Sequence, residues 1–141
     1  MSIFGKTENV YLASPLEGVI LNEGAPLAGT RLLRVLSLAG EEVLEEEAVS
    51  DEKGRFSFPD RRKSIKLTPL MELVISQKIY VLHEGEKNLV WLKSKRSPEV
   101  YSELGGRPVN FRCDITSPMR RVDIGRGLFE TSCQWDSIKS E

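Results

Sequence analysis

The sequence has few of the residues that most often carry catalysis. It contains one histidine, His83, and two cysteines, Cys113 and Cys133, which are not arranged as a CxxC pair. Zinc sites and multi-histidine active sites need more of these ligands at closer spacing. The Gly-x-Ser-x-Gly elbow of serine hydrolases and the glycine-rich fingerprints of nucleotide-binding proteins are also missing. The sequence therefore predicts no catalytic residue, no metal and no cofactor, and we expect a protein that is not an enzyme.

Long apolar runs and a strong charge of one sign are missing as well. No stretch approaches the ~20 apolar residues of a membrane-spanning helix. We expect no signal peptide in the first 15 residues, because Lys6, Glu8 and Asn9 interrupt them. The net charge is −1 with 29% charged residues, so bulk charge favours neither nucleic acid nor a membrane surface as a partner. We expect a cytoplasmic protein.

What the sequence does contain is a succession of short apolar runs separated by glycine and proline turns. Its 141 residues fit a single domain, 1–141, with a partly ordered lead-in over 1–14 and a partly ordered tail over 136–141. No long helix is convincing. The predicted strands cover 18–22, 29–36, 41–50, 54–59, 70–83 (as two strands or one bent strand), 88–94, 108–116 and 129–135. This pattern predicts an all-β fold, an antiparallel β-sandwich of about 7–9 strands, with a small barrel as the alternative.

Two of these segments leave alternatives open. The segment 41–50 is rich in Glu, Leu and Ala, which also favour helix, but turn signals on both sides favour a strand. In the segment 29–36 both sides are half apolar, which indicates either a bulge or a second face that is also covered, for example by a partner. Arg34 in this segment is either buried against a carboxylate or, as we favour, lies with its stem packed and its head in solvent.

Two later segments show strict alternation. Leu89 and Trp91 are predicted to share one side of the 88–94 strand. The residues predicted to face inward from the last two segments are Val109, Phe111, Cys113, Ile115, Phe129, Thr131, Cys133 and Trp135.

For the two cysteines we favour buried thiols. The alternatives are a cross-strand disulfide, which would close a loop of about 20 residues and contribute roughly 3 kcal/mol, and a catalytic thiolate, for which no cationic activator is evident.

One stretch carries a family resemblance. Its pattern is Gly18-Val19, then Gly24-x-Pro26-Leu27-x-Gly29, then Ser50-Asp51-x-x-Gly54-Arg55-Phe56-x-Phe58-Pro59. It resembles the carboxypeptidase regulatory-like domains, which implies a transthyretin-like (prealbumin-like) β-sandwich. The whole arrangement is similar to small stand-alone bacterial domains of this fold. Some of these are encoded beside secreted antibacterial toxins, which implies an immunity role.

Charge singles out one candidate site. The acidic residues Glu41, Glu42, Glu45, Glu46 and Glu47 fall on one predicted strand, whereas the basic residues form separate groups. The simplest interpretation is a solvated surface that keeps the protein soluble. The functional interpretation is a docking face for a basic partner, since complementary charge speeds association and fixes register.

We therefore predict a non-enzymatic protein-binding module, monomeric or homodimeric, most concretely an immunity-type protein that neutralises a type VI-like bacterial toxin by direct binding. Its partner would be a protein, with no nucleic acid and no membrane involved. The first alternative is a structural or surface accessory β-sandwich domain. The second is a hydrolase on a transthyretin-like fold, against which the single histidine weighs.

Overall fold

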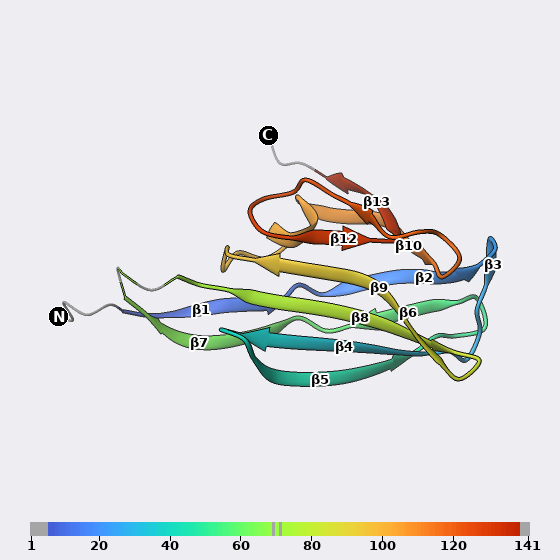
Figure 1. Cartoon of the computed structure of the whole chain (residues 1–141), viewed down its shortest axis with the longest axis horizontal. Helices are drawn as coiled ribbons and strands as arrows, with labels where there is room; N and C mark the ends of the chain where they lie inside the picture. The colour runs from blue at the N-terminus through green and yellow to red at the C-terminus, as the bar shows by residue number, and fades with distance from the viewer. Residues whose placement is uncertain (1–5, 69, 71, 139–141) are drawn as a thin grey trace.

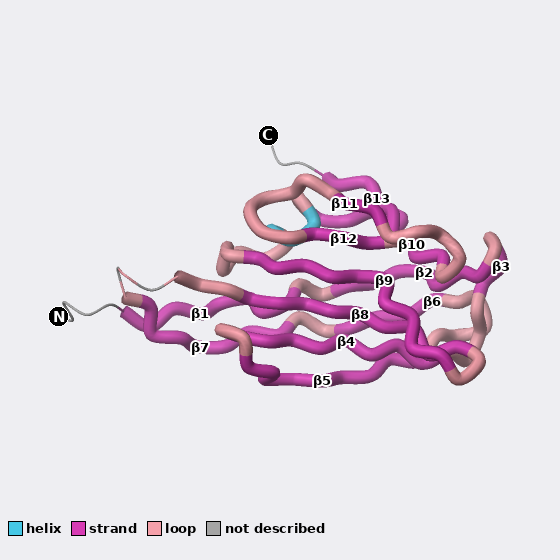
Figure 2. The backbone as a smooth tube through the Cα atoms, viewed as in Figure 1, coloured by secondary structure: helices cyan, strands magenta, loops and turns pink. Residues whose placement is uncertain are grey.

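The protein is a two-layered β-sandwich (Figures 1 and 2). The computed structural model describes residues 6–68, 70 and 72–138. The first layer is a six-stranded sheet, ordered β11 (Arg120–Arg121), β12 (Phe129–Thr131), β9 (Glu86–Lys95), β8 (Ile75–His83), β4 (Arg31–Leu38) and β5 (Glu41–Val49). The second layer is a five-stranded sheet ordered β13 (Cys133–Ile138), β10 (Arg107–Asp114), β2 (Leu16–Asn22) and β3 (Ala25–Pro26), with β6 (Arg55–Phe58) also paired to β2. The predicted antiparallel sandwich is confirmed, although β10 runs parallel to β2.

A two-stranded ribbon, β1 (Lys6–Ala13) and β7 (Arg61–Leu67), continues the second layer. The chain passes from β1 into β2 at Ser14-Pro15 and from β6 into β7 at Pro59-Asp60. Proline has no N–H to give to a ladder, so the two prolines interrupt the β2–β6 pairing at the same level. The predicted lead-in 1–14 thus contains a strand, and its residues 1–5 lie outside the described residues.

The core between the layers is aromatic. Phe56, Phe58 and Phe111 of the second layer are buried, as predicted, and Trp91 and Phe129 meet them from the first. The Trp91 and Phe129 ring centroids lie 4.7 Å apart, and those of Trp91 and Phe111 lie 5.8 Å apart. Edge-on and tilted contacts of this kind add about 0.5–1.5 kcal/mol per pair to what burial contributes. Aromatic packing therefore helps to hold the two layers together in this part of the core, whereas a second buried cluster, which includes Val10, Leu36 and Ile75, is aliphatic.

The segment 41–50 forms strand β5, as favoured over helix. Of the two alternatives for the segment 70–83, the structure shows a single strand, β8, which begins at Ile75. Met71 lies outside the described residues. The polar break around Gln77 does not end the strand, because the Gln77 side chain is buried and bonded. Its Nε2 donates to Leu12 O at 2.9 Å, and its Oε1 accepts from Trp91 Nε1 at 3.1 Å.

Two sequence predictions about the later strands are wrong. Leu89 and Trp91 lie on opposite faces of β9, because a bulge opposite Ile79 and Tyr80 adds one residue and reverses the alternation. The segment 129–135 is not one strand: β12 and β13 belong to different sheets, and the chain crosses between them at Ser132. All four of its predicted inward residues still contact the core, since each sheet contributes two of them.

Cys113 and Cys133 form a disulfide, so the favoured prediction of free thiols is wrong and the alternative of a cross-strand disulfide is confirmed. The two residues face each other directly on β10 and β13, with their Cα atoms 4.0 Å apart. Both are buried. The disulfide ties the last strand to the centre of the second layer.

Candidate protein-binding site

The acidic strand β5 forms one edge of the first sheet, and β4 is its ladder partner in the described part of the chain. Ser50 N–H donates to Thr30 O at 2.9 Å. Because backbone groups alternate in direction along a strand, this bond fixes the direction of the others. Leu44, Glu46 and Ala48 bond toward β4, whereas the N–H and C=O groups of Glu45, Glu47 and Val49 point away from the sheet. β5 thus presents an open row of backbone donors and acceptors.

The five predicted site residues all lie on β5, but they do not all face a partner. Glu41, Glu42, Glu45 and Glu47 are exposed. Glu47 pairs with Arg31 of β4, whereas no hydrogen bond or ion pair engages the other three carboxylates within the described residues. Glu46 instead points inward, with only 9% of its side chain exposed. It therefore belongs to the interior, which strand alternation predicts for one residue in two.

Glu46 holds a buried arginine in place. Its carboxylate lies 2.7 Å from Arg34 and 3.0 Å from Arg61. Arg34 also donates to Ser14 O at 3.1 Å and to Pro59 O, the two carbonyls at the point where the second layer is interrupted. The favoured prediction of a solvated Arg34 head is wrong, because its side chain is 3% exposed. Burial lowers the pKa of Arg34, and Glu46 opposes that shift.

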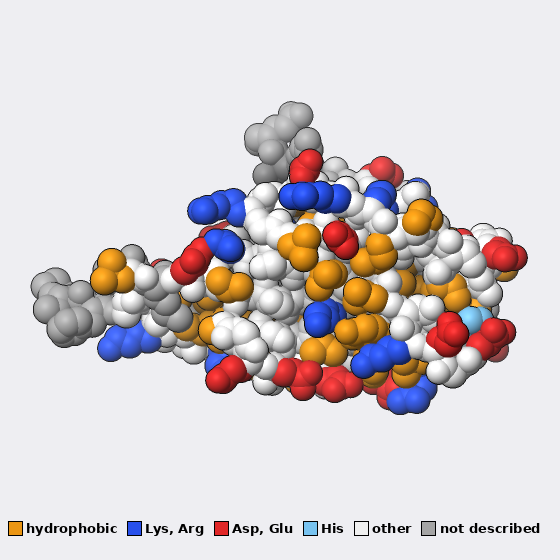
Figure 3. Space-filling view, viewed as in Figure 1, with side chains coloured by type: hydrophobic (Ala, Val, Ile, Leu, Met, Phe, Trp, Pro, Cys, Tyr) orange, Lys and Arg blue, Asp and Glu red, His pale blue; other side chains and the backbone are white. Residues whose placement is uncertain are grey.

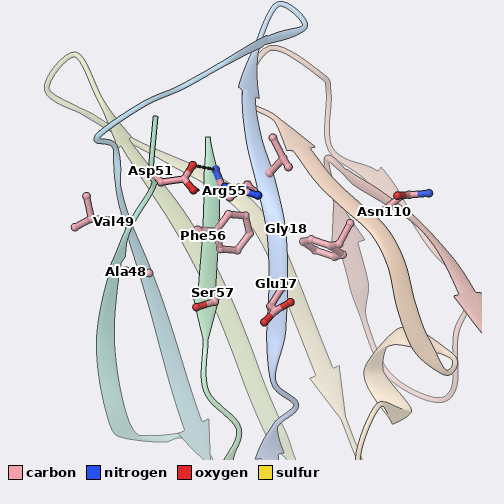
Figure 4. A pocket seen from close by; sticks show the side chains of 11 residues that line it. Glu17, Gly18, Ala48, Val49, Asp51, Arg55, Phe56, Ser57 and Asn110 are labelled. Carbon is pink, nitrogen blue, oxygen red and sulfur yellow. Dashed lines mark hydrogen bonds and ion pairs between the residues drawn. The ribbon is translucent and has the colours of Figure 1, made fainter. Parts of the chain in front are cut away.

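A groove lies beside β5. Its volume is about 530 Å³, and its walls come from β2, β5, β6 and β10 (Figure 4). β5 and β6 leave the turn at Asp51 and separate, with Ala48 and Val49 on one wall and Ser57 on the other (Figure 4). Since Ile20 N–H donates to Gly54 O, alternation directs the backbone groups of Ser57 away from β2 and toward this opening. The open edges of two strands therefore border the same groove.

The turn that joins β5 to β6 is rigidly held. Asp51 Oδ1 accepts hydrogen bonds from Lys53 N–H at 2.9 Å and Arg55 N–H at 2.8 Å, and its other oxygen pairs with the Arg55 side chain. The Arg55 backbone hydrogen bond is the main cause that lowers the pKa of Asp51. Gly54 has φ +77°, and an added Cβ would lie 2.8 Å from Ile20 O. This turn fixes the angle at which the two groove walls separate.

A second hollow of about 540 Å³ continues the groove, since both are lined by Glu17, Ser57 and Asn110. Pro15, Pro59, Pro108 and Tyr101 give it stiff walls. Asn110 sits at a bulge in β10 with φ 55°, a left-handed conformation that asparagine tolerates better than most residues. None of the three shared side chains has a hydrogen-bond partner within the described ranges. The groove and the hollow that continues it therefore offer polar groups that are still free to bind.

A buried polar cluster centred on Glu103 lies between the layers. Its carboxylate accepts from Ser14 Oγ at 2.8 Å and Gln77 Nε2 at 2.9 Å, and it pairs with Lys95 at 3.4 Å. Burial raises the pKa of Glu103, but Lys95 and these hydrogen bonds outweigh it and hold that pKa below its usual range. Sequence reasoning missed this cluster, because charged residues at inward positions of β9 are visible only once the bulge is known. Its groups are satisfied by one another, which indicates a structural role.

His83 lies at the end of β8, where its Nε2 is 3.7 Å from the exposed Glu84 carboxylate. Across the described residues, no group of three or more His, Cys, Asp or Glu side chains could hold a metal ion. The same residues include no helix that is long and apolar enough to cross a membrane.

The fold and the acidic edge define this protein as an all-β sandwich in which β5, in the described part of the chain, has a neighbouring strand on one side only. The chain belongs to a family described as a domain of unknown function, DUF6795, whose model matches residues 16–118. No curated protein and no solved structure matches the chain. The resemblance to carboxypeptidase regulatory-like domains stays a prediction.

Proposed function

We propose that this protein is a protein-binding module that captures an extended basic segment of a partner as an added strand on β5. The observation that carries this proposal is the nine-residue edge strand β5, whose outward backbone groups are unpaired within the described residues and whose exposed side chains are mostly acidic. Adding a strand to an open edge is a recurring mode of peptide recognition, in which backbone hydrogen bonds supply affinity.

The side chains of β5 define the chemistry of the partner. The outer face of β5 is acidic at its centre, at Glu45 and Glu47, and apolar at its ends, at Val43 and Val49. A strand that carries Lys or Arg opposite the glutamates and apolar residues near its ends would complement them, since opposite charges directly across a ladder contribute about 0.2–1 kcal/mol per pair. The groove beside β5 leaves room for the added strand.

The same acidic residues disfavour pairing of β5 with β5 of a second copy. An antiparallel pair of this kind would place Glu45, Glu46 and Glu47 opposite one another, and like charges across a ladder are destabilising. Charged edge strands protect sheets from aggregation in this way. The charge therefore selects against self-pairing and in favour of a basic partner. Whether the basic partner is a toxin, as an immunity protein would require, stays a prediction.

Residue-specific amide hydrogen exchange tests this function. The probe is a nine-residue peptide of alternating lysine and valine. In the free protein the amides of Glu45, Glu47 and Val49 should exchange quickly, while those of Leu44 and Ala48 are protected by β4. The peptide should protect the first three amides and leave the other two unchanged.

The matched variants are Glu42→Lys with Glu47→Lys on β5, and Glu84→Lys with Glu86→Lys at the β8–β9 turn. Both pairs change the net charge equally. Only the β5 pair should weaken peptide binding, by about tenfold if two exposed ion pairs of the size above are lost. Equal weakening in both variants would mean that only bulk charge attracts the peptide. Protection that appears away from β5 would overturn the proposed function.

The disulfide favours a second candidate, an exported accessory domain. Disulfides persist in oxidising compartments and are rare in the cytosol. The experiment is alkylation of free thiols in intact native cells, followed by mass spectrometry of Cys113 and Cys133. Complete alkylation would exclude this candidate, whereas full oxidation would support it over a cytoplasmic role.

A further inference from the structure

The outer face of the six-stranded sheet is apolar where a sandwich usually meets solvent. Figure 3 looks onto this face and shows apolar side chains gathered over β9, β8 and β4, with acidic side chains along β5. The half-buried apolar residues of this face are Leu33, Val35, Tyr80, Leu82, Leu89 and Leu92. Antiparallel sheets normally alternate apolar and polar residues, with the polar side outward. A sheet with two apolar faces points to a further layer.

The strand register arranges this face in rows. Lys78, Val35 and Glu45 form one row across β8, β4 and β5, and Tyr80, Leu33 and Glu47 form the next. Neither Lys78 nor Glu45 makes an ion pair within the described chain, and both are exposed. With strands about 4.8 Å apart, the Cα atoms of these two residues stand roughly 10 Å apart on either side of Val35. Within the described residues, each of these charges is left without an oppositely charged partner.

We propose that a second copy of this chain covers the face, related by a two-fold axis that runs along β4. With such an axis, β8 of each copy lies over β5 of the other, and each row of one copy lies over the same row of the other. Lys78 then lies opposite Glu45 of the second copy, and the reciprocal pair forms as well. Leu33 and Val35 pack against their own equivalents, and Leu82 meets Val49, which is 59% exposed in the single chain.

Two other placements of the axis fail on charge. An axis along β8 brings Lys78 against Lys78 of the second copy, and an axis across the strands lays β5 on β5. The axis along β4 leaves one like-charged contact, between the two copies of Arg31, which Glu47 of the same copy already neutralises. Sheets stack about 10 Å apart with strand directions about 30° from each other. The sheet twist therefore concentrates contact near Leu33 and Val35.

This dimer leaves the edge of β5 open. In the layer of the second copy, β9 extends past the edge of β5. Its Leu89 and Leu92 would therefore face a partner strand added to β5. This last contact rests on the proposed function, whereas the dimer itself does not.

Sedimentation equilibrium with a charge exchange tests the dimer without any peptide. The wild-type chain should be dimeric. The single variants Lys78→Glu and Glu45→Lys should each weaken dimerisation by about tenfold or more, because each places like charges opposite one another twice. Mixing the two variants should restore the dimer, since the two introduced charges then face each other with opposite sign, and the unchanged Lys78 of one chain faces the unchanged Glu45 of the other. A control, Lys66→Glu on β7, should leave the dimer unchanged.

A wild-type chain that sediments as a monomer at millimolar concentration would overturn the proposal. So would a mixture of the two variants that stays as weak as each variant alone. Thermal unfolding of each variant shows that the fold is retained, which these exposed positions favour. A wild-type chain that is monomeric, but whose β5 amides the peptide still protects, would refute this inference and leave the proposed function standing.

Discussion

Replacing the buried Arg34 tests whether this side chain stabilises the second layer where Pro15 and Pro59 interrupt its strand pairing. Replacing Arg34 by methionine keeps most of the side-chain volume and removes the guanidinium. Ser14 O and Pro59 O then lose the donor they share. Glu46 keeps only Arg61, whose side chain is 43% exposed. The change therefore removes the Arg34 donor from two carbonyl oxygens and from Oε2 of Glu46.

The magnitude follows from these losses. A buried polar group left without a partner costs about 1–3 kcal/mol, and removing one partner of a buried ion pair costs about 3–5 kcal/mol in all. Arg61 partly compensates Glu46, whereas the two carbonyls have no substitute donor. We expect Arg34→Met to lower the free energy of unfolding by about 3–5 kcal/mol, the range for breaking a buried pair.

Urea denaturation followed by tryptophan fluorescence measures this change, because Trp91 is buried in the core. The control is Arg31→Met on the same strand, where the ion pair with Glu47 is exposed and its loss should cost at most about 1 kcal/mol. If the two variants were destabilised equally, or Arg34→Met by less than about 1 kcal/mol, the assignment of Arg34 as a structural bridge would be refuted.

Three further outcomes are expected. Reduction of the Cys113–Cys133 disulfide should lower the unfolding free energy by about 3 kcal/mol, the chain-entropy value for a loop of about 20 residues, in paired denaturation curves with and without dithiothreitol. Phe56→Ala should cost about 3–5 kcal/mol in the same assay, because its side chain is buried among aromatic rings. The lowered pKa of Glu103 predicts stability that is fully present above the unfolded carboxyl value of about 4.3 and is lost as the pH falls through the folded value. Glu103→Gln should therefore flatten the acid limb of the melting temperature plotted against pH, and an unchanged slope would contradict this.

Local signals in the sequence were sufficient for much of the fold. The turn at Gly54 and the alternation of Phe56 and Phe58 predicted β6 and its buried face. Alternation also predicted that Cys113 faces inward. These inferences succeed because strand alternation and turn chemistry depend on neighbours along the chain.

The errors all come from contacts between distant segments. The bulge in β9, which separates Leu89 from Trp91, depends on the pairing with β8, which no local pattern reveals. Burial of Arg34 depends on two carbonyls exposed by the Pro15 and Pro59 interruptions in the other layer. In the candidate site, sequence placed the acidic residues on one strand, but only topology shows that this strand is an edge and that Glu46 faces inward.

The disulfide has a consequence for what counts as the folding unit. The segment that the family model matches, 16–118, contains Cys113 but not Cys133. It also leaves out Phe129 and Trp135, whose ring centroids lie 4.7 Å and 5.6 Å from that of Trp91. A chain cut to the matched segment would carry a free thiol and an open aromatic core. The part of the sequence that relatives are recognised by is thus smaller than the part that has to fold together.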